Sequence, residues 1–228
     1  MLGFKNPDIR VFSFAGSLPT TKVVNTELVA GAVSGSAFTG VTFSGTDGAT
    51  TLEMRIAQVI PPSVDDQRWQ YVIEQRRPGS QIWEQACDSP PPLFPTGEPQ
   101  NNPPRALAMP GMWFGPLYWV QSSLVTLSCE SGVAAKCDGW GFPVTKQWPN
   151  ITKNGLPTFA TGADMMQACS RMARADYCAG GMPNTLDGTP IRIDDVFTGV
   201  QPHDGFTFEA AWPGKAINDS APRPLPAI

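Results

Sequence analysis

Residues that break regular secondary structure occur throughout this chain, whose 228 residues include 24 prolines and 22 glycines. Proline fixes φ and lacks a backbone N–H, and glycine carries a high entropic cost of ordering, so both interrupt helices and strands. Such a composition favours turns and loops. We therefore expect short elements, many loops and little helix.

The rest of the composition indicates a folded protein. Hydrophobic residues make up 41% of the chain and charged residues 16%, whereas a disordered chain would be rich in charge and poor in aromatics. A net charge of -4 with 16 basic residues gives no basic face for nucleic acid, so we expect no nucleic-acid partner. No apolar run approaches the roughly 18 to 20 residues of a membrane span. Residues 1–19 lack the features of a signal peptide, so a mature form with an added methionine is expected.

Alternating apolar and polar residues predict antiparallel strands in the first third of the chain. The alternating segments are residues 11–14, 37–44 and 51–57. An Asp47-Gly48 turn joins the last two, and residues 69–74 and 81–85 form a further predicted hairpin. The expected fold class is mainly β and antiparallel, either a β-sandwich or barrel-like, in one domain over residues 1–228.

Residues 88–104 are dense in proline and show no apolar periodicity. Neither a helix nor an interior strand can persist there. The segment is expected to be an irregular surface insertion. The alternatives are a boundary between a β meander at 1–87 and a cysteine-rich part at 105–228, or a polyproline segment that binds a partner.

One principal helix is predicted near residues 162–178. Thr161 and Asp164 have the spacing of a capping box, and residues 179–181 (AGG) end the pattern. Apolar residues recur at steps of three and four between these signals, at Met165, Ala168, Cys169, Met172 and Ala173. A small-residue stretch at 131–135 is predicted to be a short helix or a broad turn.

Five cysteines occur in the chain, four of them within fifty residues, at Cys129, Cys137, Cys169 and Cys178, with Cys87 earlier. Their spacing fits no zinc motif, so disulfides are favoured over a metal site or buried free thiols. An unbroken helix would hold Cys169 and Cys178 roughly 13 Å apart, too far for a bridge. The simplest scheme therefore joins Cys129 or Cys137 to each of these two. Disulfides predict an extracellular or periplasmic location.

Several blocks of the sequence resemble the ADYC domain family of myxobacterial-type exported proteins. The blocks are residues 129–132 (CESG), 135–137 (AKC), 139–143 (GWGFP), 168–178 (ACSRMARADYC), 187–191 (DGTPI) and 209–212 (EAAW). The resemblance implies a single ADYC-like domain and export, with no established activity. Family members tend to carry a histidine where this chain has residues 165–167 (MMQ), and glycine-aspartate-glycine where it has residues 179–181. They also often place a cysteine near residues 215–218, and its absence here implies that Cys87 has no mate.

An enzyme hypothesis centres on Cys178. A thiol needs a nearby base or cation to become a nucleophile, and Asp176, Tyr177 and His203 are the candidates for that role. The activity would be that of a thiol-dependent hydrolase or transferase. A disulfide at Cys178 would abolish it, and the alternative interpretation is a helix end with Asp176 ion-paired.

Other catalytic motifs are absent from the sequence. There is no G-x-S-x-G elbow, P-loop, H-E-x-x-H or dinucleotide-binding glycine pattern. Asp194 and Asp195 could be a strand end or part of a calcium site, and no other cofactor is expected.

A binding hypothesis rests on the seven tryptophans of the chain. Trp113, Trp119, Trp140 and Trp148 lie among glycines and prolines, where loops can present aromatic faces to a ligand. Core packing is the alternative role for the same side chains. On this basis we expect an exported binding or structural module, whose partner is a polysaccharide or a cell-surface protein.

Overall fold

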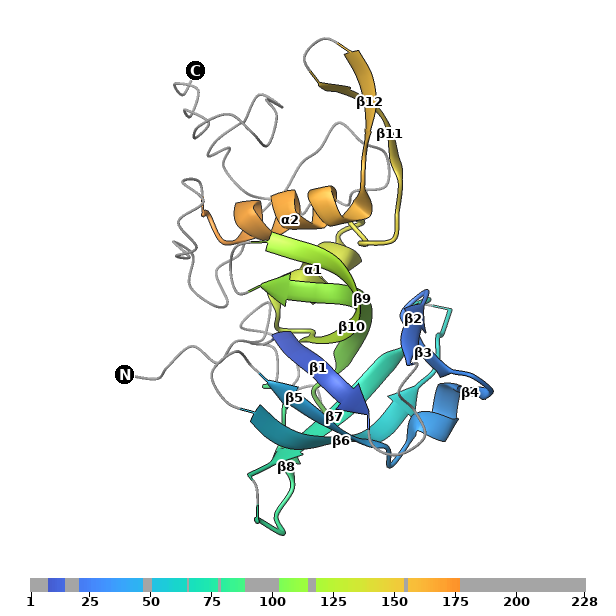
Figure 1. Cartoon of the computed structure of the whole chain (residues 1–228), viewed down its shortest axis with the longest axis vertical. Coiled ribbons are helices and arrows are strands. Elements are labelled where there is room, and N and C mark those ends of the chain that lie inside the picture. Colours follow the sequence, from blue (N-terminus) through green and yellow to red (C-terminus); the bar gives the residue numbers. More distant parts are fainter. Residues whose placement is uncertain are drawn as a thin grey trace. The chain divides into compact units, whose positions relative to one another are not determined.

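The computed structural model describes residues 8–14, 21–46, 51–64, 66–77, 79–88, 103–114, 118–153 and 156–176. The chain divides into two compact units, Met1–Lys136 and Cys137–Ile228. Figure 1 labels the helices and strands of both units.

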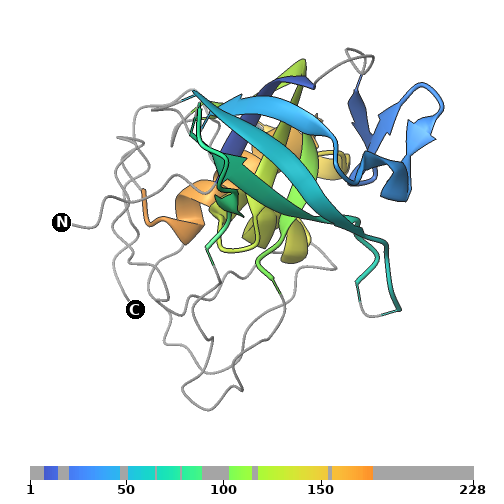
Figure 2. The ribbon, with the colours of Figure 1, turned by 90° about the horizontal axis from the view of Figure 1, so that it is seen from below.

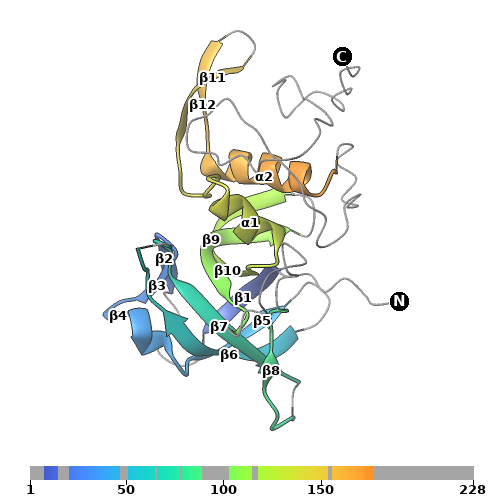
Figure 3. The same cartoon turned by 180° about the vertical axis from the view of Figure 1, so that it is seen from behind.

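The first unit is built on an antiparallel sheet whose strands pair in a closed ring. Its strands are β1 (Asp8–Phe14), β5 (Thr42–Thr46), β6 (Thr51–Ile60), β7 (Gln70–Arg76), β8 (Glu84–Gln85), β9 (Ala106–Phe114) and β10 (Tyr118–Cys129). The ring runs β1-β5-β6-β7-β9-β10 and returns to β1, and β8 lies beside β7 (Figures 2 and 3). The expected β-rich, antiparallel class is confirmed, and the closed ring is the barrel-like form of it.

Alternation along the strands explains which residues enter the core of this unit. Met54 and Ile56 of β6 are 1% and 0% exposed, whereas Glu53 and Arg55 point away from the core. The cluster of buried residues includes Phe43, Met54, Ile56, Tyr71, Ile73, Val125 and Leu127. The period of two that predicted the strands therefore also separates the inner from the outer face.

A small three-stranded sheet between β1 and β5 was not predicted. It consists of β2 (Lys22–Val24), β3 (Glu27–Ala30) and β4 (Val33–Ser34), followed by the 3₁₀ helix η1 (Gly35–Phe38). The strand predicted at 37–44 is wrong over its first half. Phe38 enters the core from η1, and the glycines at 35 and 40 have positive φ, which turns the backbone out of an extended path.

Tyr71 joins this small sheet to the closed sheet. Its hydroxyl accepts a hydrogen bond from Leu28 N at 2.8 Å and donates to Thr26 O at 3.1 Å. Trp69 N donates to Thr26 Oγ1 at 2.9 Å. Thr26 has φ +66°, which is costly for a β-branched residue, so these bonds hold a strained turn in place.

One disulfide, Cys87–Cys129, links the segment after β8 to the end of β10. The expectation that Cys87 has no mate is therefore wrong. Strands before and after the proline-rich segment pair directly, because Tyr71 of β7 faces Ala106 of β9 in the register. The pairing therefore brings the end of β10 close to Cys87. The spacing of the cysteines along the sequence does not show this proximity. Residues 89–102 lie outside the described part of the chain.

The second unit contains the hairpin β11 (Trp148–Lys153) and β12 (Leu156–Ala160), followed by α2 (Gly162–Ala173). The capping box is confirmed, because Thr161 Oγ1 accepts from Asp164 N and Thr161 N donates to the Asp164 carboxylate. The helix ends before the predicted residue 178. Arg174 caps it, and Ala175 leaves the helical conformation with φ +48°.

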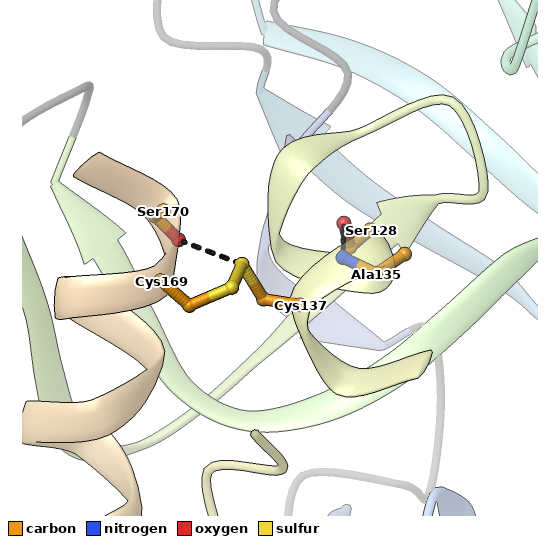
Figure 4. Close-up of a disulfide and its surroundings, with 5 residues drawn as sticks. All are labelled: Ser128, Ala135, Cys137, Cys169 and Ser170. Atoms are coloured by element: carbon orange, nitrogen blue, oxygen red, sulfur yellow. Dashed lines mark hydrogen bonds between the residues drawn. A yellow bond between two sulfur atoms is a disulfide. The ribbon is translucent and has the colours of Figure 1, made fainter. Parts of the chain in front are cut away.

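The second disulfide, Cys137–Cys169, joins α1 (Val133–Gly139) to α2 (Figure 4). This is one of the pairings that the predicted scheme allowed, and it excludes a Cys169–Cys178 bond. Ser170 Oγ lies 3.9 Å from Cys137 Sγ, and Ala135 N donates to Ser128 Oγ at 3.0 Å. The stretch at 131–135 thus leads into a short helix. Among the described residues, no helix is long and apolar enough to cross a membrane.

Candidate functional site

The predicted catalytic residues fall at the edge of the described structure. Asp176 is 3% exposed, and its backbone N–H donates to Arg171 O at 3.0 Å. Tyr177, Cys178 and His203 lie outside the described residues, so the thiol-enzyme hypothesis stays a prediction. The two disulfides use the other four cysteines of the chain, so none is left to pair with Cys178.

Two of the four tryptophans predicted to bind a ligand are buried. Trp119 is 5% exposed beneath Gly111, where an added Cβ would lie 2.6 Å from the indole Nε1. Trp148 is 2% exposed and stacks on Phe142, with ring centroids 5.6 Å apart. The burial of these two indoles agrees with the alternative of core packing rather than with presentation to a ligand. Trp140 is partly exposed on a turn, and Trp113 lies in β9, its side chain outside the described part.

A different tryptophan lies at the centre of an outer surface of the closed sheet. We define the Trp83 surface as Trp83 with Glu53, Arg55, Glu74 and Arg76. The guanidinium carbons of Arg55 and Arg76 lie 4.4 and 4.5 Å from the Trp83 ring centroid, and the indole remains partly exposed. Two guanidinium groups thus fix the position of one aromatic ring.

Each of these arginines is paired with a carboxylate across the β6–β7 ladder. Arg55 faces Glu74 and Arg76 faces Glu53 in the register. Arg55 donates to Glu74 through Nε, and Arg76 donates to Glu53 through Nε at 2.9 Å and Nη2 at 2.7 Å. The hydrogen bond from Arg76 lowers the pKa of Glu53. Two positive and two negative side chains therefore surround the Trp83 ring, and their charges cancel.

A second group of polar side chains gathers where β7 and β9 begin and β10 ends. We define the strand-end cluster as Asp66, Arg68, Gln70, Arg105 and Glu130. Gln70 is 4% exposed, and its Nε2 donates to Asp66 Oδ2 at 2.7 Å and to Glu130 Oε1 at 3.3 Å. Arg105 Nη1 donates to Gln70 Oε1 at 2.6 Å. One buried amide therefore holds two carboxylates and one guanidinium.

The two carboxylates of the strand-end cluster have opposite pKa shifts. Burial would raise the pKa of Asp66, but hydrogen bonds and charge from Arg68, at 2.7 and 2.8 Å, outweigh it and lower the pKa. Burial raises the pKa of Glu130, and the positive charges of Arg105 and Arg68 only partly oppose this. Such a division is typical of acid–base sites, although structural ion pairs also produce it.

Neither group of residues was predicted from the sequence. Trp83 falls within the second strand of the hairpin predicted at 69–74 and 81–85, outside the group of tryptophans at 113–148. The alternation of Glu53 with Arg55 and of Glu74 with Arg76 on paired strands is the signal that could have found the Trp83 surface. The strand-end cluster has no local signal, because its members come from three separate parts of the chain.

The described residues contain no group of three or more histidine, cysteine, aspartate or glutamate side chains that could hold a metal ion. Asp194 and Asp195, the predicted calcium ligands, lie outside the described part of the chain.

The fold and its disulfides define the class of protein. It has a closed antiparallel β unit, followed by a hairpin and a helix that a disulfide joins to α1. The family model of the ADYC domain matches residues 35–217, and the chain belongs to the ADYC domain family. No curated protein and no solved structure matches it.

Proposed function

We propose that this chain is exported and acts outside the cytoplasm as a binding module that takes a carbohydrate on the Trp83 surface. The observation that carries the proposal is the partly exposed indole of Trp83, held by two guanidinium groups that are themselves paired with carboxylates. Two disulfides support export, since such bonds persist in oxidising compartments.

The chemistry of the Trp83 surface suits a neutral, hydroxyl-rich ligand. The apolar C–H face of a sugar ring can stack on an indole, and its hydroxyls can bond to flanking carboxylates and guanidiniums. The pairing of Glu53 with Arg76 and of Arg55 with Glu74 leaves little net charge to attract an ionic partner. The ring is also held in place before binding, which reduces the entropic cost of ordering it.

A glycan array followed by titration calorimetry on the retained glycans tests this proposal. The wild-type protein is expected to bind a neutral glycan, and Trp83→Ala is expected to abolish that binding. Trp83→Phe keeps an aromatic face and should retain part of the affinity. Trp140→Ala is the matched control, because it removes a partly exposed tryptophan from the other unit. A flat array for the wild-type protein, or unchanged binding by Trp83→Ala, would refute the proposal.

A further inference from the structure

We propose that Arg55, Glu74 and Gln85 select the ligand of the Trp83 surface by binding two neighbouring hydroxyls of the sugar that stacks on the indole. The inference rests on the carbohydrate-binding function proposed above. It adds the class of sugar, a neutral ring with two adjacent unsubstituted hydroxyl groups. We define these three residues as the cross-strand row.

The register of three strands places the cross-strand row on one face of the sheet. Arg55 of β6 faces Glu74 of β7, and Glu74 faces Gln85 of β8 (Figure 3). Side chains directly opposite one another on paired strands lie on the same face, with Cβ atoms about 5 Å apart. Trp83 precedes Gln85 by two residues, and its ring centroid lies 4.4 Å from the guanidinium carbon of Arg55. The row therefore borders the partly exposed indole.

The two arginines beside Trp83 differ in how many of their hydrogen-bond donors are used. Arg76 binds both oxygens of Glu53, through Nε at 2.9 Å and Nη2 at 2.7 Å. Arg55 binds Glu74 through Nε alone, and among the described residues no hydrogen bond reaches its two terminal nitrogens or Glu74 Oε1. The side chain of Arg55 is 37% exposed and that of Arg76 23%. Arg76 therefore holds the ring, whereas Arg55 retains donors for a ligand.

The unused groups of the row match the hydroxyls of a sugar. The terminal nitrogens of a guanidinium form a planar pair of donors, which suits two neighbouring acceptor oxygens. Each hydroxyl can also donate, and Glu74 Oε1 and the exposed amide of Gln85 supply acceptors. An acidic sugar would bring a second carboxylate close to Glu74, and like-charge repulsion disfavours this. Two adjacent hydroxyls on a neutral ring therefore satisfy the row best.

The central part of the row is ordered before a ligand binds. The Nε bond to Glu74 and the contact with the Trp83 ring both fix the guanidinium of Arg55. The side chain of Glu74 is only 19% exposed, so its free oxygen is also confined. A ligand therefore meets donors and an acceptor already in place, which lowers the entropic cost of binding.

NMR titration of the full chain with defined sugars tests the inference. The probes are methyl β-D-glucopyranoside, methyl β-D-galactopyranoside and methyl α-D-mannopyranoside, each with its 2-, 3- and 4-deoxy derivatives. We expect the wild-type protein to bind a parent sugar among these. Two derivatives of that sugar, each lacking one of two neighbouring hydroxyls, should bind at least about 10-fold more weakly.

Matched variants separate a role in selection from a role in holding the ring. Arg55→Lys keeps the positive charge but removes the planar pair of donors. It should bind the parent sugar at least about 10-fold more weakly and no longer discriminate between the parent and its deoxy derivatives. Arg76→Lys is the control and should keep that discrimination, because the terminal donors of Arg55 remain.

A second pair of variants lies on β8. Gln85→Ala should weaken binding of the parent sugar by about 5-fold, because it removes one end of the row. Glu84→Ala truncates the neighbouring residue, whose side chain points to the opposite face, and should leave the affinity unchanged.

Three outcomes would overturn the inference: Arg55→Lys discriminates as the wild type does, Arg76→Lys loses the discrimination instead, or the wild-type protein binds none of the parent sugars. If the glycan array is positive and Trp83→Ala abolishes that binding, the proposed function stands in each case and only the role of the row is lost. A flat array removes both proposals.

Discussion

Replacing Tyr71 by phenylalanine tests how the small sheet is attached to the closed one. The substitution keeps the ring, which is fully buried, and removes only the hydroxyl. Leu28 N then loses its 2.8 Å acceptor, and Thr26 O loses its 3.1 Å donor. Burial raises the pKa of Tyr71, so the hydroxyl stays protonated and both bonds persist over the ordinary pH range.

The expected cost follows from the group left without a partner. A buried backbone donor that loses its acceptor costs about 1–3 kcal/mol, and we expect Tyr71→Phe to lower the free energy of unfolding by about 2 kcal/mol. With a urea m-value of about 2 kcal/mol/M, the midpoint should fall by about 1 M at unchanged m. The assay is urea unfolding followed by far-UV circular dichroism, with amide hydrogen exchange at Leu28 as a local readout.

Thr126→Val is the matched control for this experiment. It also deletes one buried hydroxyl from the first unit, but that hydroxyl donates to the Gly111 carbonyl, which keeps a second lone pair for another donor. We expect it to cost about 0.5–1 kcal/mol. A Tyr71→Phe variant as stable as the wild type, with unchanged exchange at Leu28, would show that the hydroxyl does not attach the small sheet.

Two further predictions concern Glu130 and Cys178. Because burial raises the folded-state pKa of Glu130, its ionisation opposes folding: stability is full below the unfolded pKa and falls as pH rises through the folded one. Glu130→Gln should therefore raise the melting temperature at pH 7. Below about pH 4 it should leave the melting temperature unchanged, because the Glu130 carboxyl is then protonated in both the folded and the unfolded state. An equal effect at the two pH values would contradict this. For Cys178, iodoacetamide added to the unfolded, unreduced protein should label one thiol per chain, on Cys178, as mapped by mass spectrometry. Label on Cys87 instead would contradict the bridge to Cys129.

The sequence predicts the regular parts of the fold well because their signals are local. Period-two alternation locates most of β6 and β7, and the capping box fixes the start of α2 at Gly162. The small sheet at 22–34 escapes detection because its strands have two to four residues, too few to show a period. The end of α2 is misplaced because Ala175, with its positive φ, carries no glycine-like signal.

The candidate sites are less predictable because they depend on pairings between distant residues. The strand-end cluster joins Gln70 to Glu130, which are 60 residues apart in the chain. No residue pattern indicates that these two meet. The burial of Trp119 could not be predicted for a related reason, because aromatic residues among glycines suit an exposed loop and a tightly packed interior equally. At Gly111 the missing side chain leaves room for the ring of Trp119.

Strand β7 contributes residues to both the strand-end cluster and the Trp83 surface. Side chains at every second position of a strand point the same way, so Gln70 lies at one end of the outer face, and Glu74 and Arg76 lie at the other. Tyr71 and Ile73 point inward and are fully buried. Substitutions on the inner face should therefore change stability, and substitutions on the outer face should change glycan affinity. An inward change such as Tyr71→Phe alters stability and leaves glycan affinity unchanged, because the ligand-binding groups and the core groups of β7 share no side chain.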